Sequence, residues 1–172
     1  MSKNYLLADT HFGHNDISKK FRTEFNSDEE HNETIHNNIL SCAGKRNHLW
    51  LLGDIAFGQE QFRKLWEYSL EFQSVNVVLG NHDHKDLTEF CIRHGINVYG
   101  FVKKWGYWLS HCPIHPQELY RGKNIHGHVH TNTVHDVVDR EFEDKRYFNV
   151  SCENVGYKPI SLQEVKERLG DE

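Results

Sequence analysis

The sequence predicts a layered α/β fold, and three observations lead to this prediction. Before residue 100, short apolar segments bounded by turn residues alternate with segments of helical periodicity. After residue 100, the pattern changes to mostly strand-like segments. Polar side chains suited to metal binding directly follow several of the apolar segments. Strands that alternate with helices and then continue alone indicate a sandwich of sheets and helices, with ligand sites at the carboxyl ends of strands.

The first half of the chain is expected to contain buried strands separated by helices. Each strand segment is short, apolar and flanked by turn residues. Ser27 and Glu30 form a capping box at the start of the first helix, and Phe62 and Leu65 belong to an apolar repeat at helical spacing. The expected strands are residues 5–8, 49–52, 75–79 and 96–99, and the expected helices are residues 27–44, 59–72 and 87–95.

The second half is expected to be rich in strands. Strand-like segments occupy residues 101–110, 123–130, 134–139 and 146–150. A last helix is expected to begin at Ser161. Because the chain has three prolines and shows neither an internal repeat nor a linker, we expect one domain over residues 1–172 without a separate cap domain.

Composition excludes several classes of protein. The formal net charge is −5, and no long basic segment is present. Since a grip on a nucleic-acid backbone requires a basic face, extended nucleic-acid binding is not expected. The sequence contains neither an apolar segment of membrane-spanning length nor a signal peptide, and its 4 cysteines form no CxxC pair. We therefore expect a cytoplasmic protein with reduced thiols and no membrane contact, as a monomer or small homo-oligomer.

Histidine is unusually frequent, with 14 residues, and several histidines follow predicted strands together with acidic side chains. The segments concerned are Asp9-Thr10-His11, Gly53-Asp54, Gly80-Asn81-His82-Asp83, Ser110-His111 and Gly127-His128-Val129-His130. In an extended chain, residues two apart point the same way, so Asp9 with His11, and His128 with His130, can each face one point. The ends of the strands should therefore bring oxygen and imidazole donors to one edge of the fold.

The set of donors favours two metal ions. Carboxylate and imidazole ligands suit zinc, manganese or iron. The candidate ligands are Asp9, His11, Asp54, Asn81, His111, His128 and His130. This set is too large for one tetrahedral ion, whereas two ions that share one carboxylate would have about four contacts each. A pair of divalent ions is typical of enzymes that catalyse displacement at phosphorus.

The same segments resemble, in composition and order, the motifs of the calcineurin-like metallophosphoesterases. They extend from residue 9 to residue 130 and include Gly-Asn-His-Asp at residues 80–83. Residues 9–15 and 149–161 are similar to the small bacterial and phage branch of that superfamily. The resemblance implies a four-layer αββα sandwich with a two-metal site at the carboxyl ends of strands.

The resemblance also implies a role for each site residue. One metal would be bound by Asp9, His11 and His130, the other by Asn81, His111 and His128, and Asp54 would bridge both. His82 would stabilise developing negative charge or protonate the leaving oxygen, and Asp83 would orient His82 through a hydrogen bond. Manganese is the expected metal, two ions per chain, with zinc, iron, nickel or cobalt as alternatives. Cys112, where a bulkier residue is common, is expected to affect packing and not the number of metals.

Residues close to these segments have two interpretations each. His14 and Asn15 either contact the substrate phosphate or form a structural turn. Arg22 either binds an anionic substrate or lies on a solvated basic face. His126 shares a strand face with His128, but it precedes the family pattern, which favours a place beside the ligands.

Two other groups of residues have weaker signals. The aromatic residues at positions 105, 107 and 108, with Lys103 and Lys104, form either a stacking platform for a base or alternating positions of a strand. The remaining histidines are expected on the surface: His31, His36, His48, His84, His94, His115 and His135.

The expected function is hydrolysis of a small phosphate ester, a phosphodiester or a nucleotide-like molecule, by attack of a metal-bridging hydroxide on phosphorus. A chain of 172 residues leaves an open metal rim, so specificity would come from the loops at residues 12–26 and 113–122. The alternatives are a metal-dependent nuclease, which the net charge of −5 disfavours, and a catalytically silent scaffold of the same fold, which the complete ligand set disfavours.

Overall fold

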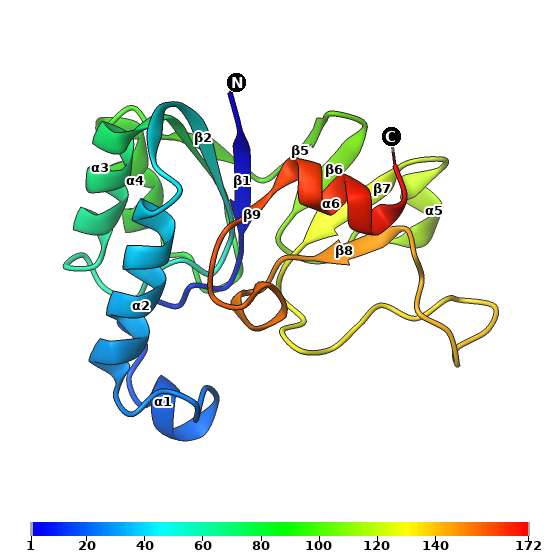
Figure 1. Cartoon of the computed structure of the whole chain (residues 1–172), viewed down its shortest axis with the longest axis horizontal. Coiled ribbons are helices and arrows are strands. Elements are labelled where there is room, and N and C mark those ends of the chain that lie inside the picture. The colour runs from blue at the N-terminus through cyan, green and yellow to red at the C-terminus, as the bar shows by residue number, and fades with distance from the viewer. Residues whose placement is uncertain (1, 172) are drawn as a thin grey trace.

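The computed structural model describes residues 2–171 and contains two β-sheets (Figure 1). The strands are β1 (Asn4–Leu7), β2 (Gly44–Leu52), β3 (Phe72–Val78), β4 (Asn97–Tyr99), β5 (Phe101–Lys104), β6 (Tyr107–Ser110), β7 (Lys123–His126), β8 (Tyr147–Asn149) and β9 (Ile160–Ser161). The helices are α1 (Ile17–Lys20), α2 (Asp28–Leu40), α3 (Phe62–Glu71), α4 (Lys85–Arg93), α5 (Pro116–Leu119) and α6 (Leu162–Leu169), with a 3₁₀ helix η1 (Cys152–Val155).

Both sheets are mixed and mostly parallel, which confirms the predicted α/β class. The larger sheet has the order β4-β3-β2-β1-β9; β1 to β4 are parallel, and β9 pairs antiparallel with β1. The smaller sheet has the order β5-β6-β7-β8, with a β5–β6 hairpin followed by parallel pairs. Because parallel neighbours end on the same side, the segments after β1, β2 and β3 emerge at one edge of the larger sheet.

Two clusters of buried side chains form the core. One cluster joins α2, α3 and α4 to one face of the larger sheet, and the other combines side chains of both sheets. Strand β2 contributes to each in alternation: Leu49 and Leu51 belong to the first cluster, and Trp50 and Leu52 to the second. This burial on both faces explains why the second half of the strand, residues 49–52, is continuously apolar in sequence. In Figure 1, the three helices lie on one side of β1 and β2, and the smaller sheet lies on the other.

The predicted helices are confirmed; α2 and α3 are shorter than predicted, and α4 begins and ends two residues earlier than the predicted segment 87–95. The first helix begins where its cap predicts, because the Ser27 hydroxyl accepts a hydrogen bond from the Glu30 backbone N–H at 3.1 Å. It ends at Leu40, and Gly44 opens β2. Ser161 and Glu164 form a complete capping box at the start of α6. Within residues 2–171, no helix is long and apolar enough to cross a membrane.

The predicted strand at residues 134–139 is wrong. The segment is a loop with one isolated bridge between His135 and Glu143. Two of its three β-branched residues, Val137 and Val138, are 62% and 92% exposed. A strand gains its stability from packing one face against neighbours, and these two side chains have no buried face to pack on.

Candidate metal centre

Most of the predicted donors lie on turns with an unusual backbone conformation. Their φ angles are positive, between 47° and 72°, a left-handed region that residues with side chains rarely adopt. These residues are Asp9, His11, Asp54, His128 and His130. Asp9 with His11, and His128 with His130, were predicted to lie on extended chain, and this prediction is therefore wrong. Such conformations cost about 1–3 kcal/mol each and concentrate at active sites and ligand clamps.

Two glycines let these turns approach one another closely. A Cβ atom at Gly80 would overlap the backbone and carboxylate of Asp54. A Cβ atom at Gly127 would overlap the carboxylate of Asp9 and the side chain of Ala8. The glycine that precedes Asn81 and the glycine that precedes His128 are thus required by packing between separate segments.

The structure brings all of the predicted donors into one cluster. Three groups of side chains place ligand atoms within 4.8 Å of one another. They are Asp9 with His11 and His130, Asp9 with Asp54 and His111, and His111 with Cys112 and His128. Asn81 adjoins them, because its Oδ1 lies 3.0 Å from His111 Nε2. The first group coincides with the set that the resemblance implies for one metal.

Cys112 does not have the role in packing that the sequence suggested. Its side chain is exposed, so it contributes little to packing. Its thiol instead lies among the ligand atoms of His111 and His128. The cluster therefore has a soft donor at its edge that the sequence interpretation did not include.

Asp54 lies between the two halves of the cluster. Its Oδ2 is 3.9 Å from His11 Nε2 and 3.3 Å from His111 Nε2. On the other side of His11, Asp9 Oδ1 is also 3.9 Å from His11 Nε2. Asp9 Oδ1 and both ring nitrogens of His11 are buried without a hydrogen-bond partner. Since unpaired buried polar atoms are costly, these convergent lone pairs fit a bound cation.

Neighbouring groups fix the orientation of the donors. The Nδ1 of His111 donates to the Leu52 carbonyl at 2.9 Å, which directs Nε2 into the cluster. Asp9 Oδ2 accepts hydrogen bonds from Ser151 Oγ at 2.7 Å and from the His128 backbone N–H at 2.9 Å, and Oδ1 is left free. His111 and Asp9 thus each present one defined atom to the cluster.

The electrostatic environment gives two central donors the protonation states that metal binding requires. Burial opposes ionisation of Asp54, but hydrogen bonds from His111 and from the His82 backbone N–H outweigh it and lower the Asp54 pKa. Burial lowers the pKa of His11, and the positive charge of Arg22 lowers it further. At neutral pH, Asp54 is therefore a carboxylate and His11 a neutral imidazole.

Two residues that support the cluster were not assigned from the sequence. Glu153 Oε1 accepts hydrogen bonds from His130 Nδ1 at 3.0 Å and from Arg22 Nε at 2.9 Å. Ser151, described above, donates to Asp9. Both lie in the segment 149–161, whose similarity to the phosphoesterase branch was noted, but neither belongs to a ligand motif.

Arg22 is buried, with 1% of its surface exposed, so its interpretation as part of a solvated basic face is wrong. Its guanidinium donates to the Asp9 carbonyl at 2.6 Å and to Glu153 at 2.9 Å. The same group contacts His31 Nε2 at 2.7 Å. Arg22 also borders a cavity of about 470 Å³ that opens beside His11 and His130. Its hydrogen bonds hold the turn that carries Asp9.

His82 and Asp83 have different surroundings. The His82 backbone N–H donates to Asp54 Oδ1 at 2.9 Å, and its exposed ring lies 6.0 Å from the His11 ring. The Asp83 carboxylate accepts the backbone N–H groups of Asp54, Ile55 and Gly80, at 2.8–2.9 Å. The hydrogen bonds of the described residues include none from Asp83 to the His82 ring, so we assign Asp83 to holding these turns instead of orienting His82.

The other candidates lie around the cluster. The His14 ring packs edge-on against Phe57 at 5.1 Å and borders the same cavity as Arg22, whereas Asn15 is exposed and does not line it. His126 is buried; its Nδ1 lies 2.8 Å from the Gly127 carbonyl and its ring packs on Tyr147. It belongs to none of the donor groups.

Seven histidines were expected on the surface. The prediction is wrong for His31, because its side chain is fully buried beside Arg22. His84, His115 and His135 are exposed as expected, and His36, His48 and His94 are half-buried.

Comparison with known proteins places the chain in a family. No family model matches the sequence. An uncharacterized protein of Methanocaldococcus jannaschii is 32% identical over 165 residues, which cover 94% of this chain and 88% of that protein. The chain belongs to the same family as this archaeal protein.

One solved structure agrees with the fold over nearly the whole chain. The crystal structure of a protein of unknown function from Aquifex aeolicus aligns with a TM-score of 0.71 and 26% identity, over 97% of this chain and 99% of that one. A phosphopantetheinyl hydrolase from Mycobacterium tuberculosis aligns with 56% of this chain and 35% of that one, at 17% identity and a TM-score of 0.39. The latter likeness is too low to support an argument.

Proposed function

We propose that this chain is a metal-dependent phosphoesterase that hydrolyses a small phosphate ester at the cluster of Asp, His and Asn donors. The single observation that supports this most strongly is the convergence of buried, unpaired donor atoms, Asp9 Oδ1 and His11 Nε2, on the carboxylate of Asp54. The resemblance of the ordered motifs to the calcineurin-like metallophosphoesterases supports the same reaction. The proposal includes the four-layer arrangement typical of that superfamily, in one domain.

The donors form two sets around Asp54. Asp9, His11 and His130 would hold one divalent ion, and Asn81, His111 and His128 the other, with Asp54 between them. When bound, such a pair of ions supplies Lewis acidity to a phosphoryl group and acidifies water. Manganese is the metal we propose, because carboxylate, amide and imidazole ligands suit it.

The chain itself contributes orientation and a proton. Ser151, Glu153 and Arg22 hold Asp9 and His130 in place through hydrogen bonds, so the donors need not rearrange during the reaction. The exposed ring of His82 lies at the rim and is free to contact the phosphate ester. We assign His82 to donating a proton from its ring nitrogen to the leaving oxygen.

Asp54→Asn tests this function. The substitution removes the charge of the carboxylate between the two donor sets, so we expect loss of bound manganese and of bis(p-nitrophenyl) phosphate hydrolysis, by at least about 100-fold. Asp139→Asn, in an exposed loop, serves as the matched control and should keep both properties. Metal content measured by mass spectrometry, together with turnover, decides the outcome. Wild-type protein that binds no metal, or an Asp54→Asn variant with normal turnover, contradicts the proposal.

A further inference from the structure

A second cavity, of about 490 Å³, opens beside the donor cluster and has mostly apolar walls. Leu79, Phe101, Trp108 and Ile114 contribute to its lining, and we call it the aromatic cavity. His111 and Asn81 line it as well, and both belong to the donor cluster. The cavity is therefore continuous with the place where the ester phosphate would bind. A ligand held by the donors can extend a further group into it.

The register of the β5–β6 hairpin explains why two aromatic rings face this cavity. Val102 pairs with Leu109, and both side chains pack in the core between the sheets. The alternate positions point the other way, because side chains alternate along a strand. Phe101 and Trp108 lie on that outer face, with ring centroids 5.7 Å apart and an interplanar angle of 57°. Core packing thus accounts for Val102, Tyr107 and Leu109 of the hairpin and not for these two.

Packing within the fold does not explain why residue 101 is a phenylalanine. Its side chain is 63% exposed at the edge of the smaller sheet, so it gains little from the fold. A large apolar side chain exposed over an apolar cavity indicates a binding surface more than a packing one.

The charges around the aromatic cavity suit an anionic ester with a flat ring. Lys103 Nζ lies 5.4 Å from the centroid of the Trp108 ring and so places a positive charge beside one of the lining rings. Glu118 borders the cavity and offers an acceptor for the amino groups of a nucleobase. Aromatic side chains bind bases by stacking, at about 1–3 kcal/mol per base.

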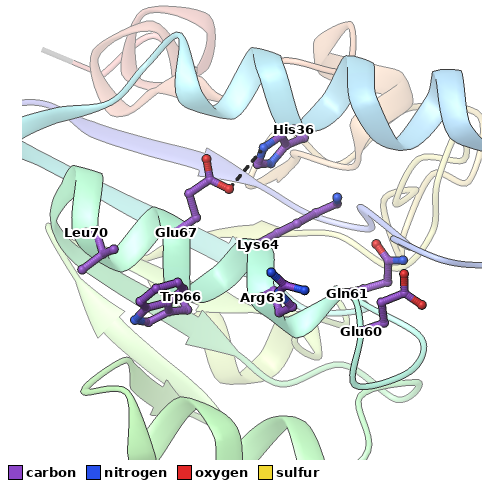
Figure 2. Close-up of a pocket in the computed structure, with 8 residues that line it drawn as sticks. All are labelled: His36, Glu60, Gln61, Arg63, Lys64, Trp66, Glu67 and Leu70. Carbon is purple, nitrogen blue, oxygen red and sulfur yellow. Dashed lines mark ion pairs between the residues drawn. The ribbon is translucent and has the colours of Figure 1, made fainter.

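Another cavity, along α3, has a different character. It has a volume of about 340 Å³, and Figure 2 shows His36 facing Glu67, at 3.5 Å, with both charged side chains such as Arg63 and Lys64 and the apolar side chains of Trp66 and Leu70 around them. None of the predicted donors lines it. The aromatic cavity, by contrast, combines apolar walls with access to the donor residues Asn81 and His111.

We propose that the aromatic cavity binds a planar aromatic group of the phosphate ester, of the nucleobase class, against the rings of Phe101 and Trp108. The position of the phosphate rests on the proposed function. Recognition of the ring does not, because it uses Phe101 and Trp108 and needs no metal. The substrate class that follows is a nucleotide-like ester with an exposed base, in preference to esters of small aliphatic alcohols.

The test measures binding of adenosine, which has a base and no phosphate, to the protein as purified. Titration by ligand-observed NMR gives its Kd for wild type and for Phe101→Ala, with ribose as the probe that lacks the ring and p-nitrophenol as the probe that has a simple aryl ring. We expect the Kd of adenosine to rise about fivefold or more in Phe101→Ala, in line with the loss of one stacking partner. Phe142→Ala is the matched control, because Phe142 is 64% exposed in a distant segment of sequence. It should leave the Kd unchanged.

Trp108→Phe and Trp108→Leu extend the test. Trp108→Phe keeps a flat ring and should retain binding, whereas Trp108→Leu should lose it; circular dichroism verifies that each variant is folded. Failure of adenosine to bind wild type, or equal binding by Phe101→Ala and wild type, overturns the inference, as does equally tight binding of ribose. Tighter binding of p-nitrophenol than of adenosine overturns the nucleobase assignment. Phe101-dependent binding of adenosine by a protein that holds no metal and hydrolyses no ester supports this inference and refutes the proposed function alone.

Discussion

Asp9 shows how single residues in this protein are set up for a ligand. One carboxylate oxygen is held by Ser151 and by the His128 backbone, and the other is buried beside His11 without a partner. Burial raises the pKa of Asp9, which the hydrogen bonds of Ser151 and His128 counter. A buried polar atom without a partner costs about 1–3 kcal/mol, so a cation at this point would relieve an unfavourable arrangement.

Ser151→Ala should weaken metal binding without unfolding the protein. The substitution removes the hydroxyl that donates to Asp9 Oδ2 at 2.7 Å, and loss of a group that orients a ligand typically lowers metal affinity about 10–100-fold. Competition with a chromophoric chelator measures the affinity. Ser41→Ala, at an exposed position, is the control. Unchanged affinity in Ser151→Ala would show that Asp9 does not bind the metal in this orientation.

His31 makes a prediction about pH. Burial, and then the charge of Arg22, lower its pKa from 6.5 to about 4. Between about pH 4 and pH 6.5 the unfolded chain binds more protons at His31 than the folded chain does. The contribution of His31 to the free energy of unfolding is therefore highest above pH 6.5, where His31 is neutral in both states, and it falls as the pH falls towards 4. His31→Gln should flatten the decline of the unfolding free energy over that window, as urea titrations at several pH values can measure.

The exposed His115 provides the comparison for this experiment. His115→Gln should keep the pH slope of the wild type. If His31→Gln and His115→Gln show equal slopes, the buried neutral state of His31 is contradicted.

At the scale of elements, the signals that are local in sequence were predicted well. Ser27 caps α2 and Ser161 caps α6 because each cap involves residues only three positions apart. Local propensity misled at residues 134–139, where adjacent valines lie in an exposed loop. The apolar ends of β2 and β3 were predicted, but their starts at Gly44 and Phe72 were not, because residues 45–48 and 73–74 are polar and carry no apolar signal.

The turns that carry the donors depend on contacts that no local pattern contains. The motifs identified the donor residues, but spacing implied an extended chain where φ is positive. Arg22 holds the Asp9 turn, and Asp83 holds the turn at Asp54 from a distance of 29 residues. Ser151 reaches Asp9 across 142 residues. Long-range hydrogen bonds of this kind cannot be predicted from residue types alone.

Gly127→Ala tests the turn at the end of β7. An added Cβ would overlap the Asp9 carboxylate, so the turn must move away from Asp9, and we expect loss of bound metal at a lowered melting temperature. Gly100→Ala is a suitable control, because a Cβ there would meet no atom within 4 Å. Normal metal content in Gly127→Ala would show that the turn can shift without affecting the donors.

At the scale of the whole molecule, the two sheets bring distant parts of the chain to one site. The donors follow β1, β2 and β3 of the larger sheet and β6 and β7 of the smaller one. The core cluster shared by the sheets fixes their relative position. Two cavities flank the donors, one beside His11 and His130 and the other beside Asn81 and His111. This arrangement gives a phosphate ester room on either side of the cluster.

The central claim is that the donor cluster holds two divalent ions. An anomalous difference map from crystals grown with manganese tests it most directly, because it locates the ions independently of any activity. We expect two peaks, one among Asp9, His11 and His130 and one among Asn81, His111 and His128, with Asp54 beside both. A map with no peak among these residues, or with manganese bound only elsewhere, would contradict it.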